Sequence, residues 1–283
     1  MTANKTSDHR ETRVALGKIG AMGDDDFEIG KAALFLAALD HPCSDINPYL
    51  DHLGEIAKDV SRLVSSDMAS SLSQKITALA DIIATEYHYS GDTHTYDDPQ
   101  NANLMNVIDR RKGLPVGLAI IYLDVAHKLH WQATGINFPG QFLIRLEQGA
   151  GRQIVDPFND GAVHNAADLR ALLKQIMGLE TELHPDHYSP VSRRDTLLRL
   201  LNNIKQRSIS CKNYERGAEI FERMLLIAPH RLSILQEASV FYSRIGNLHR
   251  AELALEAFLT RSMNNVERGE AEILLHRVRA RLN

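Results

Sequence analysis

The chain has 283 residues, 44% hydrophobic and 24% charged, so it can bury a sizeable core in one large domain or two moderate ones. Its formal net charge is −4 and it has no long run of Lys or Arg, which excludes the basic footprint of a nucleic-acid-binding protein. The longest apolar run, residues 32–39, is far shorter than the ~18 residues of a membrane span, and the N-terminus lacks the apolar segment of a secretory signal. Two cysteines without metal-ligand spacing fit a reducing compartment, so we expect a soluble cytoplasmic protein.

The N-terminal part of the chain predicts a tail followed by helices. Residues 1–24 are polar and lack helical periodicity, which predicts a flexible tail. The acidic run Asp24 to Asp26 is interpreted as the negative charge that is favoured at the N-terminus of the next helix. Apolar periodicity then predicts three helices, at about 27–39, 48–63 and 70–86.

The middle of the chain predicts one buried helix. The turn-forming segment "SGDTHTYDDPQNA" indicates an ordered loop, and "NLMNVIDRR" a short helix. Gly113 breaks the chain, and Pro115 suits the first turn of a new helix that ends near His130. This helix is apolar around most of its circumference, which predicts a central, buried position.

After Trp131 the pattern changes to that of strands. We expect strands at "QATGI", "QFLIRLE" and "GRQIVDPF", the last two joined through "QGAG" as a hairpin. Helical patterning resumes at "NAADLRALLKQI" and again from about residue 191 to the end. The order of elements therefore predicts an α+β fold with a small antiparallel sheet, followed by a helical region.

The C-terminal region repeats itself. "NYERGAEIFERMLLIAP" begins at Asn213 and "NLHRAELALEAFLTRSM" begins at Asn247, 34 residues later, with small and apolar residues at matching positions. Thirty-four residues is the tetratricopeptide period, in which paired antiparallel helices stack on neighbours. The alternative is two ordinary amphipathic helices whose spacing is a coincidence.

The ordered set of central motifs resembles a known family. "GLPVGLA", "PGQF" and "IVDPFNDG" follow the order of the transglutaminase-like branch of the papain-type fold. The longer set, from "YDDPQNANLMNVIDRRKGLPVGLAIIYLDVAHKL" to "LLRLLNNIK", is similar to the bacterial SirB-type family from about residue 27 to the end. The resemblance implies a degenerate transglutaminase-like domain over 25–190 and tetratricopeptide-like helical hairpins over 191–283.

The resemblance also implies where a catalytic triad would lie. The cysteine position falls on Pro115, the histidine position on Gln141 and the aspartate position on Asp156. A proline has no nucleophile and an amide accepts no proton near neutral pH, so conventional thiol catalysis is excluded at these positions. We expect Gln141 to hydrogen-bond to Asp156 and so preserve a rigid cleft, although Asp156 can equally be a turn residue before Pro157.

Several other groups are candidate sites. Asp124, His127 and His130 have i, i+3 spacing on a helix, but a solvated helix face explains them better than metal ligands. The segment Asp109 to Gly113 is either a solvated turn or the source of a structural arginine, Arg110 or Arg111, bonded to a carboxylate such as Asp98. Asp98 itself is expected to form a turn or cap a helix. We interpret Cys43 as an incidental thiol and Cys211 as a core residue.

These observations favour a protein without catalytic activity, metal or cofactor. The leading hypothesis is a scaffold or regulatory protein that binds a protein or peptide partner through the former cleft or the helical repeats. Asn137 and Phe158 are possible groove residues. The alternative is a hydrolase or acyltransferase that uses the same cleft with non-standard residues. The sequence does not specify the oligomeric state.

Overall fold

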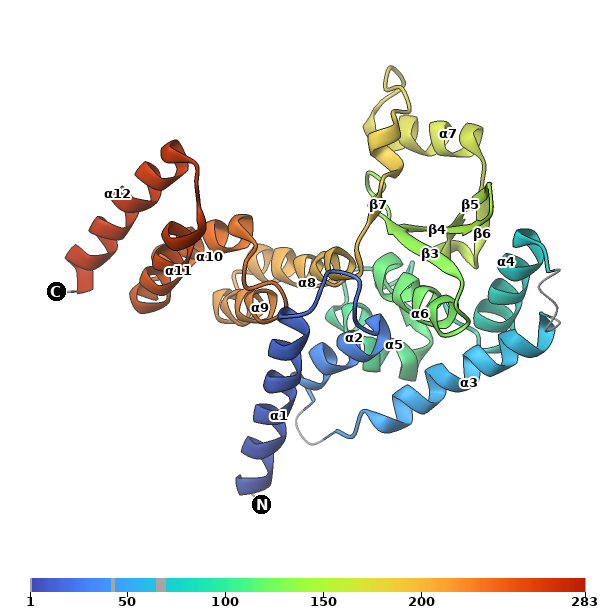
Figure 1. Ribbon diagram of the computed structural model, residues 1–283, viewed down its shortest axis with the longest axis horizontal. Helices are drawn as coiled ribbons and strands as arrows, with labels where there is room; N and C mark the ends of the chain where they lie inside the picture. The colour runs from blue at the N-terminus through green and yellow to red at the C-terminus, as the bar shows by residue number, and fades with distance from the viewer. Residues whose placement is uncertain (1, 42–43, 65–69, 283) are drawn as a thin grey trace. The chain divides into compact units, whose positions relative to one another are not determined.

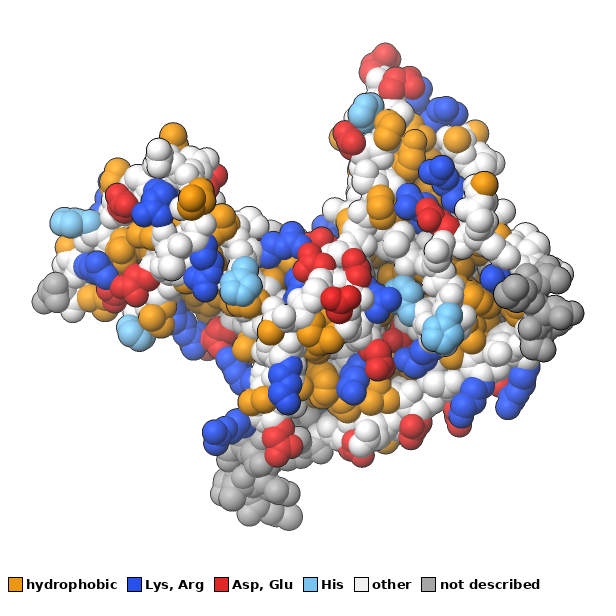
Figure 2. All heavy atoms as spheres, in the orientation of Figure 1, with side chains coloured by type: hydrophobic (Ala, Val, Ile, Leu, Met, Phe, Trp, Pro, Cys, Tyr) orange, Lys and Arg blue, Asp and Glu red, His pale blue; other side chains and the backbone are white. Residues whose placement is uncertain are grey.

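The computed structural model describes residues 2–41, 44–64 and 70–282. These residues form two compact units (Figure 1), Met1–Ala15 with Met22–Leu200 and Leu16–Ala21 with Leu201–Asn283. The main boundary lies ten residues after the predicted position at 190. None of the described helices combines the length and the apolar character that a membrane span requires. On the face that Figure 2 shows, basic and acidic side chains are interspersed.

Apart from α1, which is described below, the α-helices of the first unit agree with the predicted ones within a few residues. The unit also holds a π-helix (η1), three short 3-10 helices and a two-stranded parallel ladder of β1 and β2. Its elements up to the central helix are α2 (Ile29–Ala38), α3 (Asn47–Leu63), α4 (Leu72–Ala80), η1 (Asp81–Glu86), β1 (Ser90–Gly91), η2 (Pro99–Ala102), α5 (Leu104–Arg110), β2 (Lys112–Gly113) and α6 (Pro115–Lys128).

The central helix α6 is buried from its first residue to Ala126. It packs against α2, α3 and α5 on one side and against strands β3 and β4 on the other (Figure 1). Its apolar surface on all sides explains this position, because a helix that is hydrophobic all round must be covered all round. The prediction of a central, buried helix is confirmed.

A five-stranded antiparallel sheet covers one side of α6. Its order is β6-β5-β4-β3-β7, and β4 and β5 form the predicted hairpin through "QGAG". The strands and the elements that follow them are β3 (Gln132–Ile136), β4 (Leu143–Gln148), β5 (Gly151–Asp156), η3 (Pro157–Asn159), β6 (Ala162–His164), α7 (Ala166–Met177), η4 (Pro185–Tyr188) and β7 (Pro190–Val191).

Both faces of the sheet are covered at its centre. The neighbours Leu143 and Ile144 point to opposite faces, and both are fully buried. Leu143 joins a cluster with Leu169 and Leu173 of α7, so α7 covers the face opposite to α6. The α+β fold that the sequence predicts is therefore confirmed for the first unit.

Two expectations for the N-terminal residues are wrong. Residues 2–20 form helix α1 (Thr2–Gly20), in which Leu16 and Ile19 are buried, instead of a flexible tail. The short apolar stripe of this helix was hidden by its polar composition. The acidic run after it does not supply the first turn of α2, which begins at Ile29 and has no acidic residue in that turn.

The acidic run instead caps helix α8 (Arg193–Ser210), about 170 residues away in the sequence. Asp25 Oδ1 accepts from the backbone N–H of Arg193 at 2.8 Å, and the carbonyl oxygen of Asp24 accepts from Arg194 N–H at 3.1 Å. The buried Arg194 side chain also donates to Asp24 Oδ1 at 2.6 Å. These bonds satisfy N–H groups that the first turn of every helix leaves open.

The second unit consists of consecutive helices that pack against one another. They are α9 (Tyr214–Ile227), α10 (Leu232–Arg244), α11 (Leu248–Arg261) and α12 (Asn265–Leu282). The two copies of the repeat begin in the same way, because Asn213 and Asn247 have nearly equal backbone angles and each accepts from the N–H three residues on. The repetition in the sequence thus corresponds to structurally equivalent helix starts. The tetratricopeptide assignment itself stays a prediction.

Candidate functional site

The position that the family resemblance assigns to a catalytic cysteine is the first residue of α6. Pro115 is buried, and the residue before it, Leu114, has the extended backbone of a helix N-cap without making a side-chain cap. The N–H of Leu114 donates to the carbonyl oxygen of Asn101 at 3.0 Å. Pro115 therefore has the place predicted for it, and its ring offers no atom that can attack a substrate.

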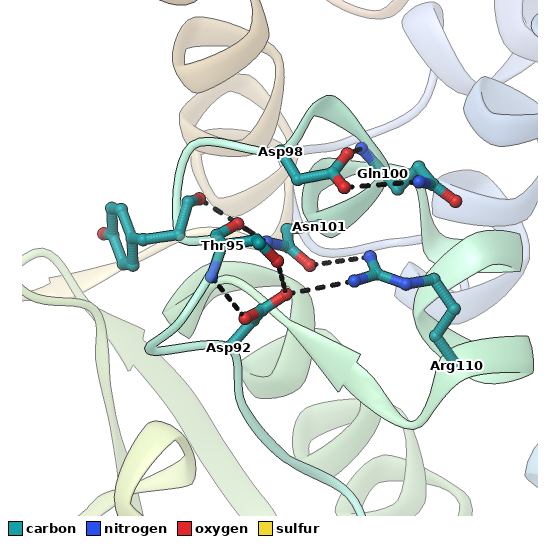
Figure 3. A network of polar contacts seen from close by, with 7 residues as sticks. Asp92, Thr95, Asp98, Gln100, Asn101 and Arg110 are labelled. Carbon is teal, nitrogen blue, oxygen red and sulfur yellow. Dashed lines mark hydrogen bonds and ion pairs between the residues drawn. The ribbon is translucent and has the colours of Figure 1, made fainter.

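A polar network holds the loop in front of α6 (Figure 3). The buried carboxylate of Asp92 accepts from Thr95 N–H at 2.8 Å, from Thr95 Oγ1 at 2.6 Å and from Arg110 Nη2 at 3.0 Å. Arg110 Nη1 donates to Asn101 Oδ1 at 2.9 Å, and Asn101 Nδ2 donates back to the carbonyl oxygen of Thr95 at 2.6 Å. The hydrogen bonds from Thr95 hold the pKa of the Asp92 carboxyl well below its usual range, and those from Asn101 and Arg110 act in the same direction.

The network corrects the expectation for "DRRKG". Arg110 is structural, but its carboxylate partner is Asp92 and not Asp98. Asp98 caps η2 instead, accepting from Gln100 N–H at 2.9 Å, which confirms its predicted capping role.

Arg111 also has a fixed environment. It has the left-handed backbone conformation, with φ of 59°, and its guanidinium lies over the ring of Tyr89 with 4.8 Å between the guanidinium carbon and the ring centroid. Its Nη1 contacts Tyr89 OH and His52 Nε2, two atoms that lie 2.9 Å from each other. Burial and, to a smaller extent, the Arg111 charge lower the pKa of His52 to about 4. The solvated-turn alternative is therefore wrong for both arginines.

The aspartate position of the triad has a capping role. Asp156 ends β5 and is 1% exposed. Its Oδ1 accepts from Phe158 N–H at 2.9 Å and from Asn159 N–H at 3.4 Å, and its Oδ2 accepts from Asn159 Nδ2 at 2.7 Å. This geometry matches the turn-residue alternative, because the carboxylate stabilises the chain reversal that follows it.

The predicted bond between Gln141 and Asp156 is not formed. The backbone N–H of Gln141 closes the Pro-Gly turn on the carbonyl oxygen of Phe138 at 3.0 Å, but its side-chain Oε1 is buried without a hydrogen-bond partner among the described residues. The register of β4 and β5 places Leu143 opposite Asp156, because Ile144 is paired with Val155. Gln141 thus lies two residues, or ~7 Å, further along the chain, and the hydrogen bonds of Asp156 go to its own turn.

The two predicted groove residues have different environments. Asn137 is exposed in the connection after β3. Phe158 is half-buried and packs edge-on against Tyr96, with 5.9 Å between the ring centroids. Its ring also lies against Gly91, where an added Cβ would come within 2.6 Å of it. Phe158 therefore fills the space beside β1, and only Asn137 is open to solvent.

The sequence reasoning missed two residues near Asp156. His164 of β6 has its Nε2 3.5 Å from Asp156 Oδ2. The hydroxyl of Tyr122 on α6 is buried without a partner among the described residues, and burial raises the pKa of this phenol. One signal pointed to β6, since "DG" at 160–161 is a hairpin-turn dipeptide and both residues have positive φ, as such a turn needs.

The remaining candidate residues have structural partners or lie outside the site. Asp124 is buried and accepts from Gly30 N–H at 3.0 Å and from Lys128 Nζ at 2.6 Å, so the expected solvated face is wrong for Asp124, whereas His130 is exposed as expected. No cluster of three or more metal-ligating side chains occurs among the described residues. Cys211 is exposed, which corrects its expected core position, and it belongs to the second unit. Cys43 lies outside the described residues.

Comparisons with known proteins find similar sequences in several bacteria. A protein of Xylella fastidiosa named UPF0162 is 29% identical over 85% of this chain and 86% of its own length. The UPF0162 protein PA3419 of Pseudomonas aeruginosa is 30% identical over 62% of this chain and 63% of its own, and protein SirB1 of Salmonella typhimurium is 23% identical over 91% and 94%. Among solved structures, menin aligns with a TM-score of 0.40 and 10% identity over 96% of this chain and 74% of its own, too low a score to indicate a common fold.

The profile that describes the Transglutaminase-like superfamily matches residues 47–202, more than half of the chain. The match begins at α3 and includes α6, the whole five-stranded sheet and the three positions that were predicted for a triad. The chain therefore belongs to the transglutaminase-like superfamily.

Proposed function

We propose that this protein is a non-catalytic member of the superfamily, a scaffold or regulatory protein that binds a protein or peptide partner. The observation that carries the proposal is the state of the triad positions. Pro115 opens α6 with no nucleophile, Gln141 has no acid–base group, and Asp156 uses its carboxylate to cap its own turn.

The energetic argument is that the nucleophile and the base are missing and not only weakened, while the Asp156 carboxylate is kept in a capping role. Thiol catalysis needs a thiolate, an imidazole that takes up its proton and a carboxylate that orients the imidazole. Loss of such groups typically lowers the rate by ~10³- to 10⁶-fold, or roughly 4 to 8 kcal/mol of barrier. Meanwhile the loop in front of α6 keeps a complete hydrogen-bonded network around Asp92, so the fold is maintained where the chemistry is lost.

The second unit supports the binding half of the proposal. Several large apolar side chains on it are exposed, including Leu253 at 52%, Val266 at 72% and Ile273 at 58%. Large apolar side chains that stay exposed on packed helices supply contact area that a partner can cover.

Catalysis is tested with the full-length protein and fluorogenic amide and thioester peptides. We expect no turnover above buffer, and no change when Asp156 is replaced by Ala. Turnover that disappeared in the folded Asp156→Ala protein would contradict the proposal.

Partner binding is tested by photo-crosslinking in cells of the source organism. A benzophenone amino acid is placed at Leu253 or Ile273, at Gln141, and at the exposed Lys58 of α3 as a control. We expect one protein to be crosslinked from Leu253 and from Ile273, and not from Lys58. Crosslinks from Gln141 alone would move the binding surface to the former cleft, and equal crosslinks from all positions would contradict a specific surface.

One observation favours the alternative of a hydrolase or acyltransferase with non-standard residues. His164 Nε2 lies 3.5 Å from Asp156 Oδ2, so an imidazole and a carboxylate are still neighbours, although on a different strand from the one the family pattern uses. Turnover abolished by His164→Ala and retained by His187→Ala, a change in η4, would establish this alternative in place of the scaffold.

A further inference from the structure

A pocket of about 380 Å³ lies in the first unit, away from the triad positions. Its walls come from the C-terminal half of α6, from β3, from β7 and from the start of α8, with one residue of the acidic run at its rim. Pro115 and His127 are twelve residues apart on α6, so the pocket lies ~18 Å along the helix from the predicted cysteine position. The volume is within the range of small-molecule sites, roughly 300 to 1,000 Å³.

The pocket combines apolar walls with a few polar groups. Leu123, Ala133, Pro190 and Val191 supply the apolar surface. The hydroxyls of Ser192 and Thr196 are used inside α8, because they donate to Asp195 Oδ2 at 2.8 Å and to the carbonyl oxygen of Ser192 at 2.9 Å. The polar groups with bonding capacity left are therefore those of His127, Thr134, Asp25 and Arg193.

His127 has a defined tautomer. Its Nε2 lies 2.8 Å from the carbonyl oxygen of Ala133, which can only accept, so Nε2 carries the proton and Nδ1 is an acceptor. Burial is the main cause that lowers the pKa of His127, and the nearby Arg193 charge acts in the same direction. The imidazole is thus neutral at pH 7, with an unused lone pair.

Two polar atoms at this wall have no partner in the described part of the chain. They are His127 Nδ1 and Thr134 Oγ1, each almost closed to solvent. Buried polar atoms are nearly always hydrogen-bonded, so two such atoms on neighbouring elements of one pocket indicate groups kept for a ligand.

The charges at the pocket are balanced. Arg193 uses one N–H for the carbonyl oxygen of Phe27, at 2.8 Å, and Asp25 uses Oδ1 for Arg193 N–H, at 2.8 Å. The other guanidinium N–H groups of Arg193 have no hydrogen bond to any residue that the structure describes, and neither has Asp25 Oδ2. Figure 2 shows acidic, basic and histidine side chains side by side at the surface where α8 begins. One cation and one anion beside an apolar wall favour a ligand that carries both charges and an apolar group.

We propose that this pocket binds a small zwitterion, a free amino acid or a dipeptide with an apolar side chain. The ligand carboxylate bonds to Arg193 and the Thr134 hydroxyl, and its ammonium group bonds to Asp25 and to His127 Nδ1. The apolar side chain lies against Leu123, Ala133 and Val191. This binding is independent of the partner binding proposed above.

The first test uses the unmodified full-length protein and calorimetric titration with three related compounds. L-Leucine carries both charges, 4-methylpentanoate lacks the ammonium group and 3-methylbutylamine lacks the carboxylate. We expect saturable binding of leucine and at least about tenfold weaker binding of each analogue, because each loses a charge-assisted contact. Comparable affinity for an analogue and leucine would overturn the zwitterion assignment.

The second test uses substitutions at the pocket. Arg193→Gln and Thr134→Val are each expected to weaken leucine binding, by about tenfold and severalfold respectively. The matched controls are Arg152→Gln at an exposed position and Thr181→Val at a half-buried position, both outside the pocket lining, and they should leave leucine binding unchanged. Thr134→Val keeps the shape of the side chain, so it remains informative if Arg193→Gln proves unstable.

The result that would overturn the site is equally definite. Leucine, valine and glycyl-leucine are each titrated up to about 10 mM, where even a millimolar Kd gives a measurable signal. No saturable binding of any of the three would overturn the proposal. Binding that both pocket variants retained while folded would also overturn it.

Discussion

The two ends of helix α6 use polar side chains in opposite ways. At the N-terminal end, the buried Asp92 is surrounded by donors from Thr95 and Arg110, and the loop in front of Pro115 is closed by hydrogen bonds. At the C-terminal end, His127 Nδ1 and Thr134 Oγ1 have no partner among the described residues and lie beside a pocket. The network around Asp92 in front of α6 is fully bonded within the protein, whereas the two atoms at the C-terminal end lie beside a pocket with their bonding capacity unused.

The difference separates two uses of a polar side chain in one fold. A polar group that is fully bonded within the protein holds its segment in place but has nothing left for a substrate. A polar group without a protein partner stabilises nothing in the free protein and is available to a ligand. The predictions therefore compare the two ends. The fluorescence of Trp131, the only tryptophan in the sequence, reports on the unfolding of the first unit.

The largest effect is expected from Gly117→Trp at the N-terminal end. A Cβ at this buried position already lies 3.3 Å from the carbonyl oxygen of Asn101, so an indole must displace the loop. We expect a loss of about 3 kcal/mol or more in the free energy of unfolding, measured by urea titration. Gly117→Ala should change it by less than ~1 kcal/mol, because the higher helix propensity of Ala offsets the tight contact. An unchanged midpoint for the Trp variant would show that this end is loosely packed.

The next effect is expected from Asp92→Asn. The amide loses the charge that Arg110 and both Thr95 donors need, which should cost roughly 2 to 3 kcal/mol at pH 7. Because the folded pKa of Asp92 is lowered, its contribution is present above pH ~4 and is lost as the pH falls below that value. The variant should therefore show a flatter acid limb in its stability profile than the parent. Asp51→Asn, on an exposed face of α3, should leave that limb unchanged.

A matched pair of threonine substitutions compares the two ends directly. Thr95→Val removes a hydroxyl that donates to a buried carboxylate at 2.6 Å, and we expect it to cost about 1 to 2 kcal/mol. Thr134→Val removes a buried hydroxyl without a described partner, so stability should stay within about 0.5 kcal/mol or rise. Equal losses in urea titrations of the two variants would contradict the contrast between the ends.

The smallest effect is a pH dependence shared by His52 and His127. Both have folded pKa values below the ordinary value near 6.5, about 4 for His52, so the unfolded chain binds more protons in this range. The contribution of the two neutral imidazoles to the free energy of unfolding is therefore fully present above pH ~6.5 and is lost on acidification. The melting temperature should be a few degrees lower at pH 5 than at pH 7. His127 faces Asp25, Asp124, Arg193 and the Ala133 carbonyl, whereas His52 faces Arg111.

Glutamine substitutions separate the contributions of His52 and His127 to this pH dependence. His52→Gln and His127→Gln should each reduce the difference in melting temperature between pH 7 and pH 5. Only the His127 variant should also change the stabilisation that leucine produces. A pH dependence unaffected by both substitutions would contradict this assignment.

Much of the fold could be predicted from short-range patterns. The apolar circumference of residues 115–128 predicted the buried helix, and "QGAG" predicted the β4–β5 hairpin, because helix period and turn chemistry act within a few residues. The strand β6 was missed although "DG" marked its turn, and α1 was missed because Leu16 and Ile19 are a short stripe in a polar segment. These misses concern elements whose apolar signal is weak.

In the candidate site, too, some features follow from the residue types and others only from the tertiary structure. The absence of a nucleophile at Pro115 and of a base at Gln141 follows from residue type alone, because no environment can give a proline ring a thiol or make an amide a base near neutral pH. Which partners the polar groups take was decided only by the tertiary structure, as in the pairing of Asp92 with Arg110, of Asp25 with α8 and of Asp156 with its own turn. A hydrogen bond depends on positions within about 3 Å, and segments up to 170 residues apart reach such positions only when the chain is folded.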